Sequence, residues 1–268
     1  SEIKIPELYY LDKAWNPYFV AEAYNRDCIL KLRDRLESWA GRTIGESDLR
    51  AAIEACNRNR ALLSEVMALR APDPPRLSGV DALAIVSSSM FVSKADHNVW
   101  LERLLAKARD MPARCGARIF VGGSPFDHSQ LYELIESFGA TVVAEDHCWG
   151  ARVCDRPVST SSDPLHALAE RFHCRPACSI LFPIERTIQA SVERALRTKA
   201  DAAIFYVMEG DWSQNWETPD EVERLRSHSM PVLHLRSQPY EVDLNGPIRG
   251  QIETFLASLA TARGEVST

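Results

Sequence analysis

The sequence predicts an α/β protein in which a mainly helical segment precedes a parallel β-sheet. Two observations lead to this prediction. Between about residues 20 and 110 the apolar side chains recur at helical spacing, with no convincing strand pattern between them. After Gly116 the pattern changes to short apolar runs that alternate with helical stretches. Because this alternation is typical of doubly wound sheets, we expect a Rossmann-like, flavodoxin-like domain over residues 116–268 and a mainly helical segment over residues 1–115.

The first 115 residues are expected to form one short strand followed by helices. Leu-Tyr-Tyr-Leu at residues 8–11 is a short apolar run closed by Asp12, and it predicts the single N-terminal strand. Gly41 is a natural stop for the first helix, and the proline-rich residues 71–75 break the second. Helical spacing predicts four helices, at about residues 21–40, 47–69, 80–86 and 99–109.

Four apolar runs predict the strands of the sheet, at residues 117–121, 141–144, 202–208 and 231–235. The stretch between the first two strands reads as a helix that opens at Ser124 and stops at Gly139. Strand, tight turn, helix and strand form a βαβ unit, so the two strands should be parallel. Two more helices are expected, at residues 218–228, where Thr218-Pro219-Asp220-Glu221 looks like a capping box, and at 248–260.

Composition limits the class of protein. The 268 residues are 46% hydrophobic and 25% charged, which is ordinary for a globular chain that can bury its own core. The net charge is −6 and the basic residues form no run, so no nucleic acid is expected as a partner. No apolar run approaches the roughly 20 residues that span a bilayer, and no apolar leader is visible. We therefore expect no membrane partner, a cytoplasmic location, and seven cysteines that remain thiols.

Ligands of open parallel sheets bind outside the carboxyl ends of the strands, so the loops at those ends are candidate sites. Three loops qualify, at residues 122–127, 145–152 and 209–217. In the first, Gly122, Gly123 and Ser124 come just before a helix N-terminus, where backbone donors can bind an anionic ligand. The alternative is a tight turn with an ordinary helix cap, because the loop matches neither G-x-G-x-x-G nor a Walker A motif.

The second loop reads Glu145-Asp146-His147-Cys148-Trp149-Gly150-Ala151-Arg152. Glu145 and Asp146 are candidate catalytic acids, because adjacent carboxylates can raise one pKa into the range of acid–base chemistry. Cys148 and Arg152 are candidate ligand-binding residues, one as a thiol ligand or nucleophile and the other as a partner for an anion. The alternative is structural: Arg152 pairs with one of the two acids, and Gly150 lets the chain turn.

The third loop contributes Trp212, a candidate ligand-binding residue whose indole could stack on a flat group, although packing in the core or at an interface is the alternative. No metal site is expected. Cysteines and a histidine gather between Cys148 and Cys178, but C-x-x-C spacing is absent and Cys174 and Cys178 offer only C-x3-C. Neither G-x-S-x-G nor H-E-x-x-H occurs, so nucleophilic hydrolases and zinc proteases have no support.

Several of these stretches together resemble the 2-hydroxyacyl-CoA dehydratase family, which includes benzoyl-CoA reductase subunits. Similar stretches follow one another over nearly the whole chain, from Tyr9-Tyr10-Leu11-Asp12 to Gly250-Gln251-x-x-Thr254-x-Leu256. The resemblance implies ATP-driven, low-potential electron transfer to a CoA thioester. Such enzymes are heterodimers of two related subunits, and a separate activator supplies them with electrons. The most specific pattern is the family's E/D-D-x-C-x-G-x-R, matched by Glu145, Asp146, Cys148, Gly150 and Arg152.

Two departures from the family's pattern concern its iron–sulfur cluster. Family subunits usually carry a further N-terminal domain with two cluster cysteines, and this chain begins at the strand that follows that domain. The third cluster cysteine usually follows the late strand, where this chain has Gly210. A thiolate cluster cannot be held without thiolates. We therefore expect no cofactor in this chain, and an iron–sulfur cluster, if one is used, in a partner subunit.

Three functional hypotheses follow. In the first, the chain is a cluster-free scaffold or partner subunit of an acyl-CoA enzyme, next to a related cluster-bearing subunit and in contact with a CoA thioester. In the second, it is a divergent non-redox protein that binds a CoA ester or a protein partner. In the third, it is a cofactor-free enzyme that uses Glu145 and Asp146. A cluster-bearing partner in co-purification favours the first, a stable colourless protein alone the second, and thioester turnover without ATP or reductant the third.

Overall fold

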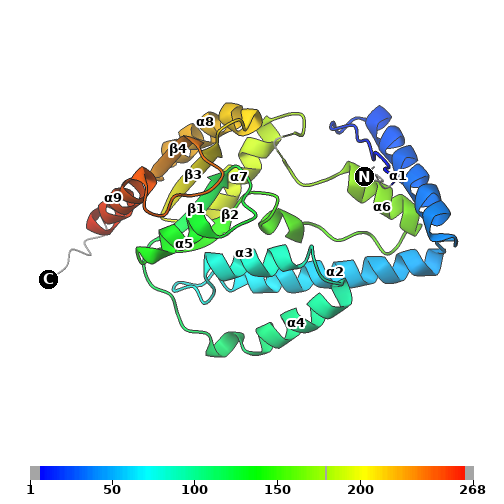
Figure 1. Cartoon of the computed structure of the whole chain (residues 1–268), viewed down its shortest axis with the longest axis horizontal. Coiled ribbons are helices and arrows are strands. Elements are labelled where there is room, and N and C mark those ends of the chain that lie inside the picture. The colour runs from blue at the N-terminus through cyan, green and yellow to red at the C-terminus, as the bar shows by residue number, and fades with distance from the viewer. Residues whose placement is uncertain (1–6, 179, 263–268) are drawn as a thin grey trace, which may run out of the picture. The chain divides into compact units, whose positions relative to one another are not determined.

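Figure 1 shows the computed structural model of the chain, which describes residues 7–178 and 180–262. The chain divides into two compact units. The first comprises Ser1–Glu54 and Pro157–Pro176, and the second comprises Ala55–Arg156 and Ala177–Thr268. The first strand of the structure begins at Arg118, close to the change of pattern expected after Gly116. The two compact units, however, do not divide the chain at residue 115 or 116.

In the first unit, helix α1 (Phe19–Ala40) packs against helix α6 (Pro164–His173). α1 ends as predicted at Gly41, which has the left-handed backbone (φ +62°) that glycine adopts without strain. The side chain of the buried Asn25 accepts a hydrogen bond from Ala14 N (2.8 Å) and donates one to Ala14 O (3.0 Å). The strand expected at residues 8–11 is wrong: the segment has no regular secondary structure, and a side chain rather than a partner strand holds the backbone that follows it.

The second unit opens with a helical part. Ser78 and Ser93 cap two of its helices by accepting hydrogen bonds from the backbone of Asp81 and Asp96. The fourth predicted helix begins at Lys94 rather than near residue 99. None of the described helices is both long and apolar enough to cross a membrane. The elements are α2 (Glu46–Ala68), which begins in the first unit, α3 (Gly79–Ser88), α4 (Lys94–Ala106) and the 3-10 turn η1 (Ala108–Asp110).

The sheet of the second unit has four parallel strands in the order β2-β1-β3-β4. They are β1 (Arg118–Gly123), β2 (Thr141–Glu145), β3 (Ala202–Met208) and β4 (Val232–Gln238). The predicted fold class, a parallel α/β sheet after a helical segment, is therefore confirmed. The chain runs outward from β1 to β2 and then returns to the other side of β1, so its direction reverses between β1 and β3. In such sheets, ligands bind at the carboxyl ends of the strands on either side of this reversal.

Helices cover both faces of the sheet (Figure 1). Successive residues of a strand point to opposite faces. Ile119 and Val121 therefore pack with α5 (Gln130–Ser137) and α9 (Pro247–Ala262). Phe120, between them, packs with α7 (Glu185–Arg197) and α8 (Trp212–Ser227) on the other face. Burial on both faces explains why each strand appears in the sequence as an unbroken apolar run.

Helix α8 differs most from the prediction. It begins at Trp212 rather than at Thr218, so most of the expected loop 209–217 is helical. The cap is Asp211, whose side chain accepts a hydrogen bond from Gln214 N (3.2 Å). Pro219, expected at the first helical position, lies inside the helix. Helices α6 and α7 were not expected from the sequence, and α5 begins at Gln130 rather than at Ser124.

Replacement of Gly123 tests the pairing of β1 with β3. Gly123 has φ of +100°, and a Cβ there would lie 2.3 Å from Tyr206 O. Gly123→Ala should therefore lower the free energy of unfolding by about 2 kcal/mol or more. Gly250→Ala in α9 is the control: nothing lies within 4 Å of its added Cβ, and alanine should stabilise the helix by up to about 1 kcal/mol. Urea denaturation measures both, and an unchanged stability for Gly123→Ala would contradict this strand register.

Candidate functional site

The first and third predicted loops meet where β1 and β3 end. Ser124 Oγ accepts a hydrogen bond from Met208 N (3.0 Å), the last residue of β3. The same hydroxyl donates to Asp211 Oδ2 (2.6 Å), the cap of α8. Ser124 is buried, and its hydroxyl acts both as a hydrogen-bond acceptor and as a donor within the protein.

The two glycines of the first loop allow β1 to approach β3 closely. A Cβ on Gly122 would lie 2.6 Å from the Phe205 ring, and one on Gly123 would meet the carbonyl of Tyr206. These contacts give both glycines a packing role. The binding of an anion by Gly122, Gly123 and Ser124 stays a prediction, and the contacts agree with the alternative of a tight, capped turn.

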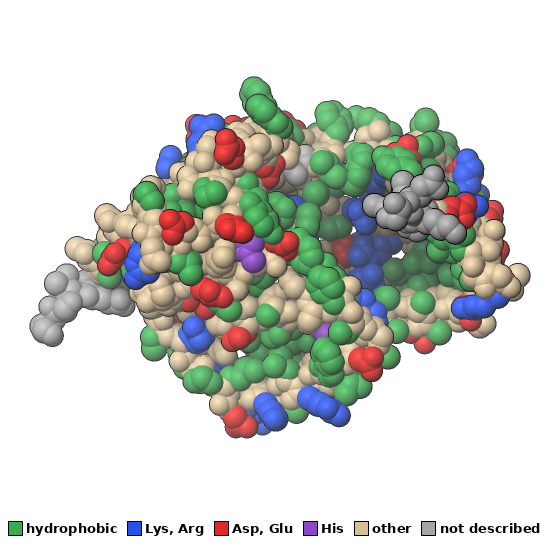
Figure 2. Space-filling view, in the orientation of Figure 1, with side chains coloured by type: hydrophobic (Ala, Val, Ile, Leu, Met, Phe, Trp, Pro, Cys, Tyr) green, Lys and Arg blue, Asp and Glu red, His purple; other side chains and the backbone are tan. Residues whose placement is uncertain are grey.

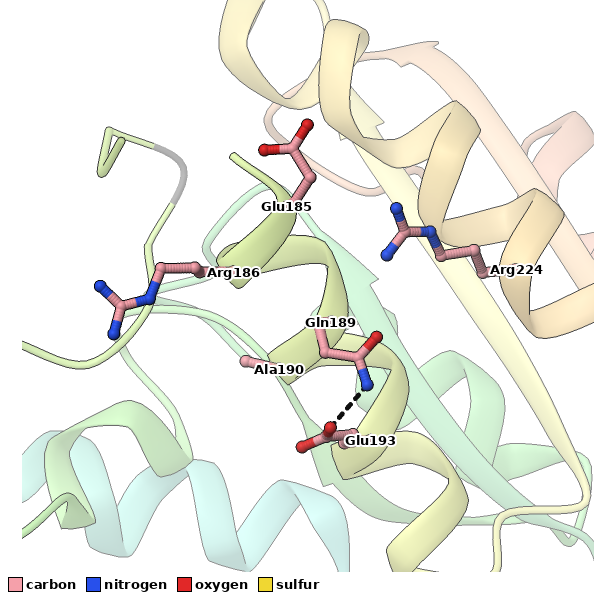
Figure 3. A pocket seen from close by; sticks show the side chains of 6 residues that line it. All are labelled: Glu185, Arg186, Gln189, Ala190, Glu193 and Arg224. Carbon is pink, nitrogen blue, oxygen red and sulfur yellow. Dashed lines mark hydrogen bonds between the residues drawn. The ribbon is translucent and has the colours of Figure 1, made fainter. Parts of the chain in front are cut away.

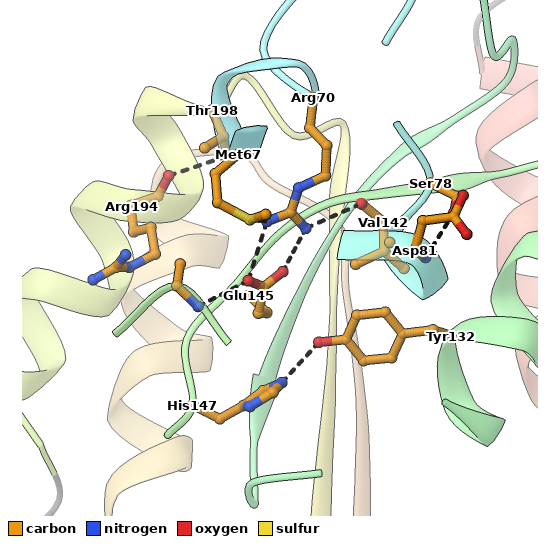
Figure 4. A network of polar contacts seen from close by, with 12 residues as sticks. Met67, Arg70, Ser78, Asp81, Tyr132, Val142, Glu145, His147, Arg194 and Thr198 are labelled. Atoms are coloured by element: carbon orange, nitrogen blue, oxygen red, sulfur yellow. Dashed lines mark hydrogen bonds and ion pairs between the residues drawn. The ribbon is translucent and has the colours of Figure 1, made fainter. Parts of the chain in front are cut away.

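Glu145, the last residue of β2, is paired with Arg70 in the interior of the second unit (Figure 4). Its two oxygens lie 2.5 and 3.1 Å from the two terminal nitrogens of Arg70, and each side chain is only 2% exposed. Burial works to raise the pKa of Glu145, but the charge and hydrogen bonds of Arg70 outweigh it and hold that pKa at about 2. Glu145 also accepts a hydrogen bond from Ala151 N (3.0 Å) and fills the space where Gly150 lacks a Cβ.

Asp146 is held by arginines of its own loop and of α7. Arg152 Nε lies 2.8 Å from Asp146 Oδ1, and the Arg152 NH2 group lies 3.2 Å from Oδ2. Arg194 Nε is 3.5 Å from the same Oδ1. A further Arg152 nitrogen lies 4.0 Å from the sulfur of Cys148. Four of the predicted residues, Glu145, Asp146, Cys148 and Arg152, thus come together in one loop, with the ion pair that the structural alternative expects.

His147 points into the core from the same loop (Figure 4). Its Nε2 lies 2.7 Å from the hydroxyl of Tyr132 on α5. Burial lowers the pKa of His147 to about 4, so the ring is neutral near pH 7. Neither this histidine nor Tyr132 was assigned a role from the sequence.

Two glutamates of α8 that were not considered as site residues from the sequence lie buried beside this network. Glu217 is 2% exposed, and its Oε2 has no hydrogen-bond partner. Glu221, one turn further on, is 4% exposed and accepts a hydrogen bond from Ser191 Oγ (2.8 Å). Burial raises the pKa of Glu217 to about 7 and that of Glu221 to about 8, and the charge of Asp146 acts in the same direction while Arg152 opposes it. Both were missed because their helix was expected to begin at Thr218.

Trp212 lies apart from the ion-pair network. It is 77% exposed, and Trp216 on the same face of α8 is 78% exposed. In Figure 2, apolar side chains stand out from the surface at the position of α8. Because an exposed indole without a facing wall does not enclose a ligand, the geometry favours a surface role over ligand stacking.

A groove between α7 and α8, about 470 Å³ in volume, is lined mainly by charged and polar side chains (Figure 3). Gln189 Nε2 donates a hydrogen bond to Glu193 Oε1 there (2.5 Å). None of the residues predicted from the sequence lines it. The lining residues are Glu185, Arg186, Gln189, Ala190, Glu193 and Arg224.

The donors in the second unit do not fit a cluster held by three or four thiolates. Among residues 7–178 and 180–262, no group of three or more histidine, cysteine or acidic side chains is arranged to hold a metal ion. Gly210, just beyond the end of β3, offers no side chain, and its φ of +81° is of the kind that glycine adopts readily.

The ion pair of Arg152 gives a prediction for stability. Arg152→Ala leaves Asp146 buried with only the longer contact to Arg194, so the free energy of unfolding should fall by on the order of 3 kcal/mol. Arg58→Ala is a matched control, because its pair with Glu102 is exposed and should contribute less than about 1 kcal/mol. Chemical denaturation of both variants measures the difference. Equal losses would show that Asp146 does not depend on Arg152.

The buried acids of α8 give a prediction for pH dependence. Their folded-state pKa values of about 7 and 8 lie above those of an unfolded glutamate, so the folded state keeps protons that the unfolded chain loses. Stability from these groups is therefore present at about pH 5 and is lost as pH rises to about 8. Glu221→Gln should gain stability relative to the parent over this range, by up to about 1.4 kcal/mol per pH unit.

Glu223→Gln is the control, because Glu223 is on the same helix and exposed. Its stability difference from the parent should stay constant over the same pH range. Urea unfolding at about pH 5, 6.5 and 8 supplies both series. A constant difference for Glu221→Gln as well would contradict a protonated, buried Glu221.

Comparison with known proteins shows which family and which individual proteins this chain is similar to. The family model of the 2-hydroxyglutaryl-CoA dehydratase D-component matches residues 2–259. A benzoyl-CoA reductase subunit of Thauera aromatica is 30% identical over 257 residues, covering 93% of this chain and 65% of that protein. The beta subunit of lactoyl-CoA dehydratase of Anaerotignum propionicum is 22% identical over 231 residues, covering 85% and 60%. The (R)-phenyllactyl-CoA dehydratase beta subunit of Clostridium sporogenes is 23% identical over 176 residues, covering 65% and 47%.

The chain thus matches between 47% and 65% of the length of these relatives. The family match includes the helical segment, all four described strands and the loop with the two buried ion pairs. The resemblance inferred from the E/D-D-x-C-x-G-x-R pattern is therefore confirmed. This chain belongs to the 2-hydroxyglutaryl-CoA dehydratase D-component family and is homologous to benzoyl-CoA reductase and acyl-CoA dehydratase subunits.

Proposed function

We propose that this chain is a subunit of an acyl-CoA dehydratase or benzoyl-CoA reductase-like enzyme, in which it serves as a cluster-free scaffold or partner of a related, cluster-bearing subunit. The three relatives named above are themselves subunits, which supports a role in an assembly. The observation that carries the scaffold role is the burial of both acids of the E/D-D-x-C-x-G-x-R pattern in arginine ion pairs.

Acids held in this way are poorly suited to proton transfer. A general base must be able to take a proton from a ligand near the working pH. Both oxygens of Glu145 are engaged by Arg70, and its pKa of about 2 makes it a weak base. Asp146 lies between Arg152 and Arg194. This geometry favours a structural role for the two acids, as members of ion pairs, over the catalytic role considered from the sequence. It also weakens the hypothesis of a cofactor-free enzyme that uses Glu145 and Asp146.

In the proposed complex, the partner subunit holds the iron–sulfur cluster. Gly210 stands where the resemblance places a cluster cysteine, and the donors described here do not fit a cluster. Contact with the partner is assigned to Trp212 and Trp216, because exposed aromatic side chains are typical of the cores of protein interfaces. A CoA thioester would lie at the ends of β1 and β3, where sheets of this kind bind ligands.

A second candidate is a non-redox protein that binds a CoA ester without a cluster-bearing partner. The reversal of strand order between β1 and β3 supports it equally, because that position serves ligand binding whether or not electrons are transferred. Calorimetric titration of the isolated chain with CoA and acetyl-CoA, together with the assembly experiment below, separates the two. Tight CoA binding by a chain that recruits no partner would favour this second candidate.

The assembly experiment is an anaerobic purification of the tagged chain from its native host. We expect a second chain of the same family to co-purify and to carry the iron and sulfide of the complex. The tagged chain, separated from it, should contain no stoichiometric cluster. About four irons per tagged chain, as a [4Fe–4S] cluster requires, would overturn the cluster-free role, and a monomer without iron or partner would overturn the subunit role.

Two variants test the proposed interface. A double variant that combines Trp212→Ala and Trp216→Ala should reduce the recovery of the partner severalfold. Its melting temperature should not fall, because both indoles are exposed in the chain alone. Leu196→Ala is the control, since Leu196 is an exposed apolar residue on α7, near the helix end that precedes β3. Equal recovery of the partner by the parent chain, the double tryptophan variant and Leu196→Ala would show that the interface lies elsewhere.

A further inference from the structure

We propose that His97 is a pH-sensitive switch, which holds helix α4 against helices α2 and α3 when its ring is neutral and releases α4 when the ring is protonated. His97 lies on α4 and is only 1% exposed. Its Nδ1 lies 2.8 Å from Asn59 Nδ2 on α2, and its Nε2 lies 3.0 Å from Ser88 Oγ on α3. The switch belongs to the helical part of the second unit, and it does not depend on the proposed role of the chain as a subunit.

The backbone carbonyl of Ala55 determines where the hydrogen of the His97 ring lies. A carbonyl oxygen can only accept a hydrogen bond, so the Asn98 atom 3.2 Å from it is the amide nitrogen. Asn98 Oδ1 therefore accepts from the amide nitrogen of Asn59 (2.8 Å). The second hydrogen of that nitrogen points to His97 Nδ1 (2.8 Å), which accepts it and so carries no hydrogen of its own.

The backbone carbonyl of Ile85 fixes the hydrogen bonds on the other side of the ring. Ser88 Oγ donates its one hydrogen to Ile85 O (2.8 Å) and must accept from Nε2 of His97 (3.0 Å). All these hydrogen bonds are made only by a neutral ring with its hydrogen on Nε2. A proton added to Nδ1 would face the NH2 group of Asn59, and rotation of that amide would turn its oxygen toward the oxygen of Asn98.

The charged groups around His97 also disfavour a second proton on its ring. Lys94 lies one turn earlier on α4. On α2, the titratable side chains next to Asn59 are the thiol of Cys56 and the guanidinium of Arg60. Burial, together with the charge of Lys94, lowers the pKa of His97.

The acids of the same helices are engaged elsewhere. Asp96 accepts a hydrogen bond from Ser93 Oγ (2.6 Å) at the N-terminus of α4. Glu102 pairs with Arg58 on the exposed side of the helices (3.0 Å). The end of α3 that contacts His97 carries serines and no charge. In this part of the described chain, a protonated His97 would thus be buried without a carboxylate to pair with.

The contact at His97 also holds the turn between α3 and α4. Ser88 precedes this turn and His97 follows it, so their hydrogen bond closes it. Phe91 lies within the turn and stacks on Trp149 of the loop 145–152, with ring centroids 6.1 Å apart and 20° between the ring planes. Protonation of His97 should therefore loosen α4 together with the turn and move Phe91 away from Trp149.

Acid favours the open form, because this form binds a proton more readily than the closed form does. In an opened α4 the ring of His97 is in water and has an ordinary pKa of about 6.5, whereas its pKa in the closed form is lower. The closed form is thus fully favoured above about pH 6.5. Below that pH, the opening constant should rise by up to about tenfold per pH unit, until the lowered pKa is passed.

NMR of the purified chain with 15N-labelled histidine tests the state of the ring. At about pH 7, the ring of His97 should carry its hydrogen on Nε2 and none on Nδ1. The variant His97→Gln identifies these signals by their loss. A hydrogen on Nδ1 at this pH would overturn the proposal, because it contradicts the hydrogen bond from Asn59.

Hydrogen exchange measured by mass spectrometry, between about pH 5 and 7.5 and corrected for the intrinsic exchange rate, tests the opening of residues 89–106. In the parent, their opening constant should rise severalfold per pH unit below about pH 6.5. His97→Gln should lose this rise, because a glutamine amide can both accept and donate but does not titrate. His228→Gln is the control, since His228 is exposed at the end of α8, and it should follow the parent.

The same rise in the parent and in His97→Gln would show that another group opens α4. Should His97→Gln not fold, the parent alone decides: an opening constant of residues 89–106 that stays level from about pH 7 to 5 would reject the switch.

Discussion

The buried ion pair between Arg70 and Glu145 is the contact on which the rest of the candidate site depends. With only 2% of either side chain exposed, loss of one partner would leave a charge without water or a counter-ion, at a cost of several kcal/mol. The pair joins the chain just after α2 to the end of β2. Glu145 then accepts the Ala151 amide and packs where Gly150 has no side chain, so the turn after β2 is shaped from inside the protein.

A second layer of charge surrounds this pair. Asp146 is flanked by Arg152 and Arg194, so one carboxylate faces two guanidinium groups. One further negative charge nearby would neutralise the group. Burial raises the pKa of Glu217 to about 7 and that of Glu221 to about 8, so together they supply roughly half of that charge at about pH 7 and more as pH rises. The positive charge that remains around Asp146 is thus partly offset by acids of the protein itself, which agrees with the proposed scaffold role.

The sheet was predictable because its signals are local: runs such as residues 202–208 are apolar throughout and bounded by turn residues. The same local pattern identified the loop with Glu145 and Asp146 and the alternative pairing of Arg152. It could not identify Arg70, because this residue precedes Glu145 by 75 positions and only the folded chain brings them together. Glu217 was missed for a different reason: Thr218-Pro219 imitates a helix start, whereas the cap at Asp211 begins the helix earlier and turns this acid inward.

The register of α8 explains why Ser124 matters although it need not touch a ligand. At 100° per residue, Trp212 and Trp216 share one face of the helix, and Glu217 and Glu221 lie roughly opposite. A shift of the helix start would rotate acids toward solvent and indoles toward the sheet. The start is fixed by Asp211, which Ser124 holds from the end of β1. The loop that was a candidate anion site from the sequence thus positions, through the hydroxyl of Ser124, both the buried acids and the exposed indoles of α8.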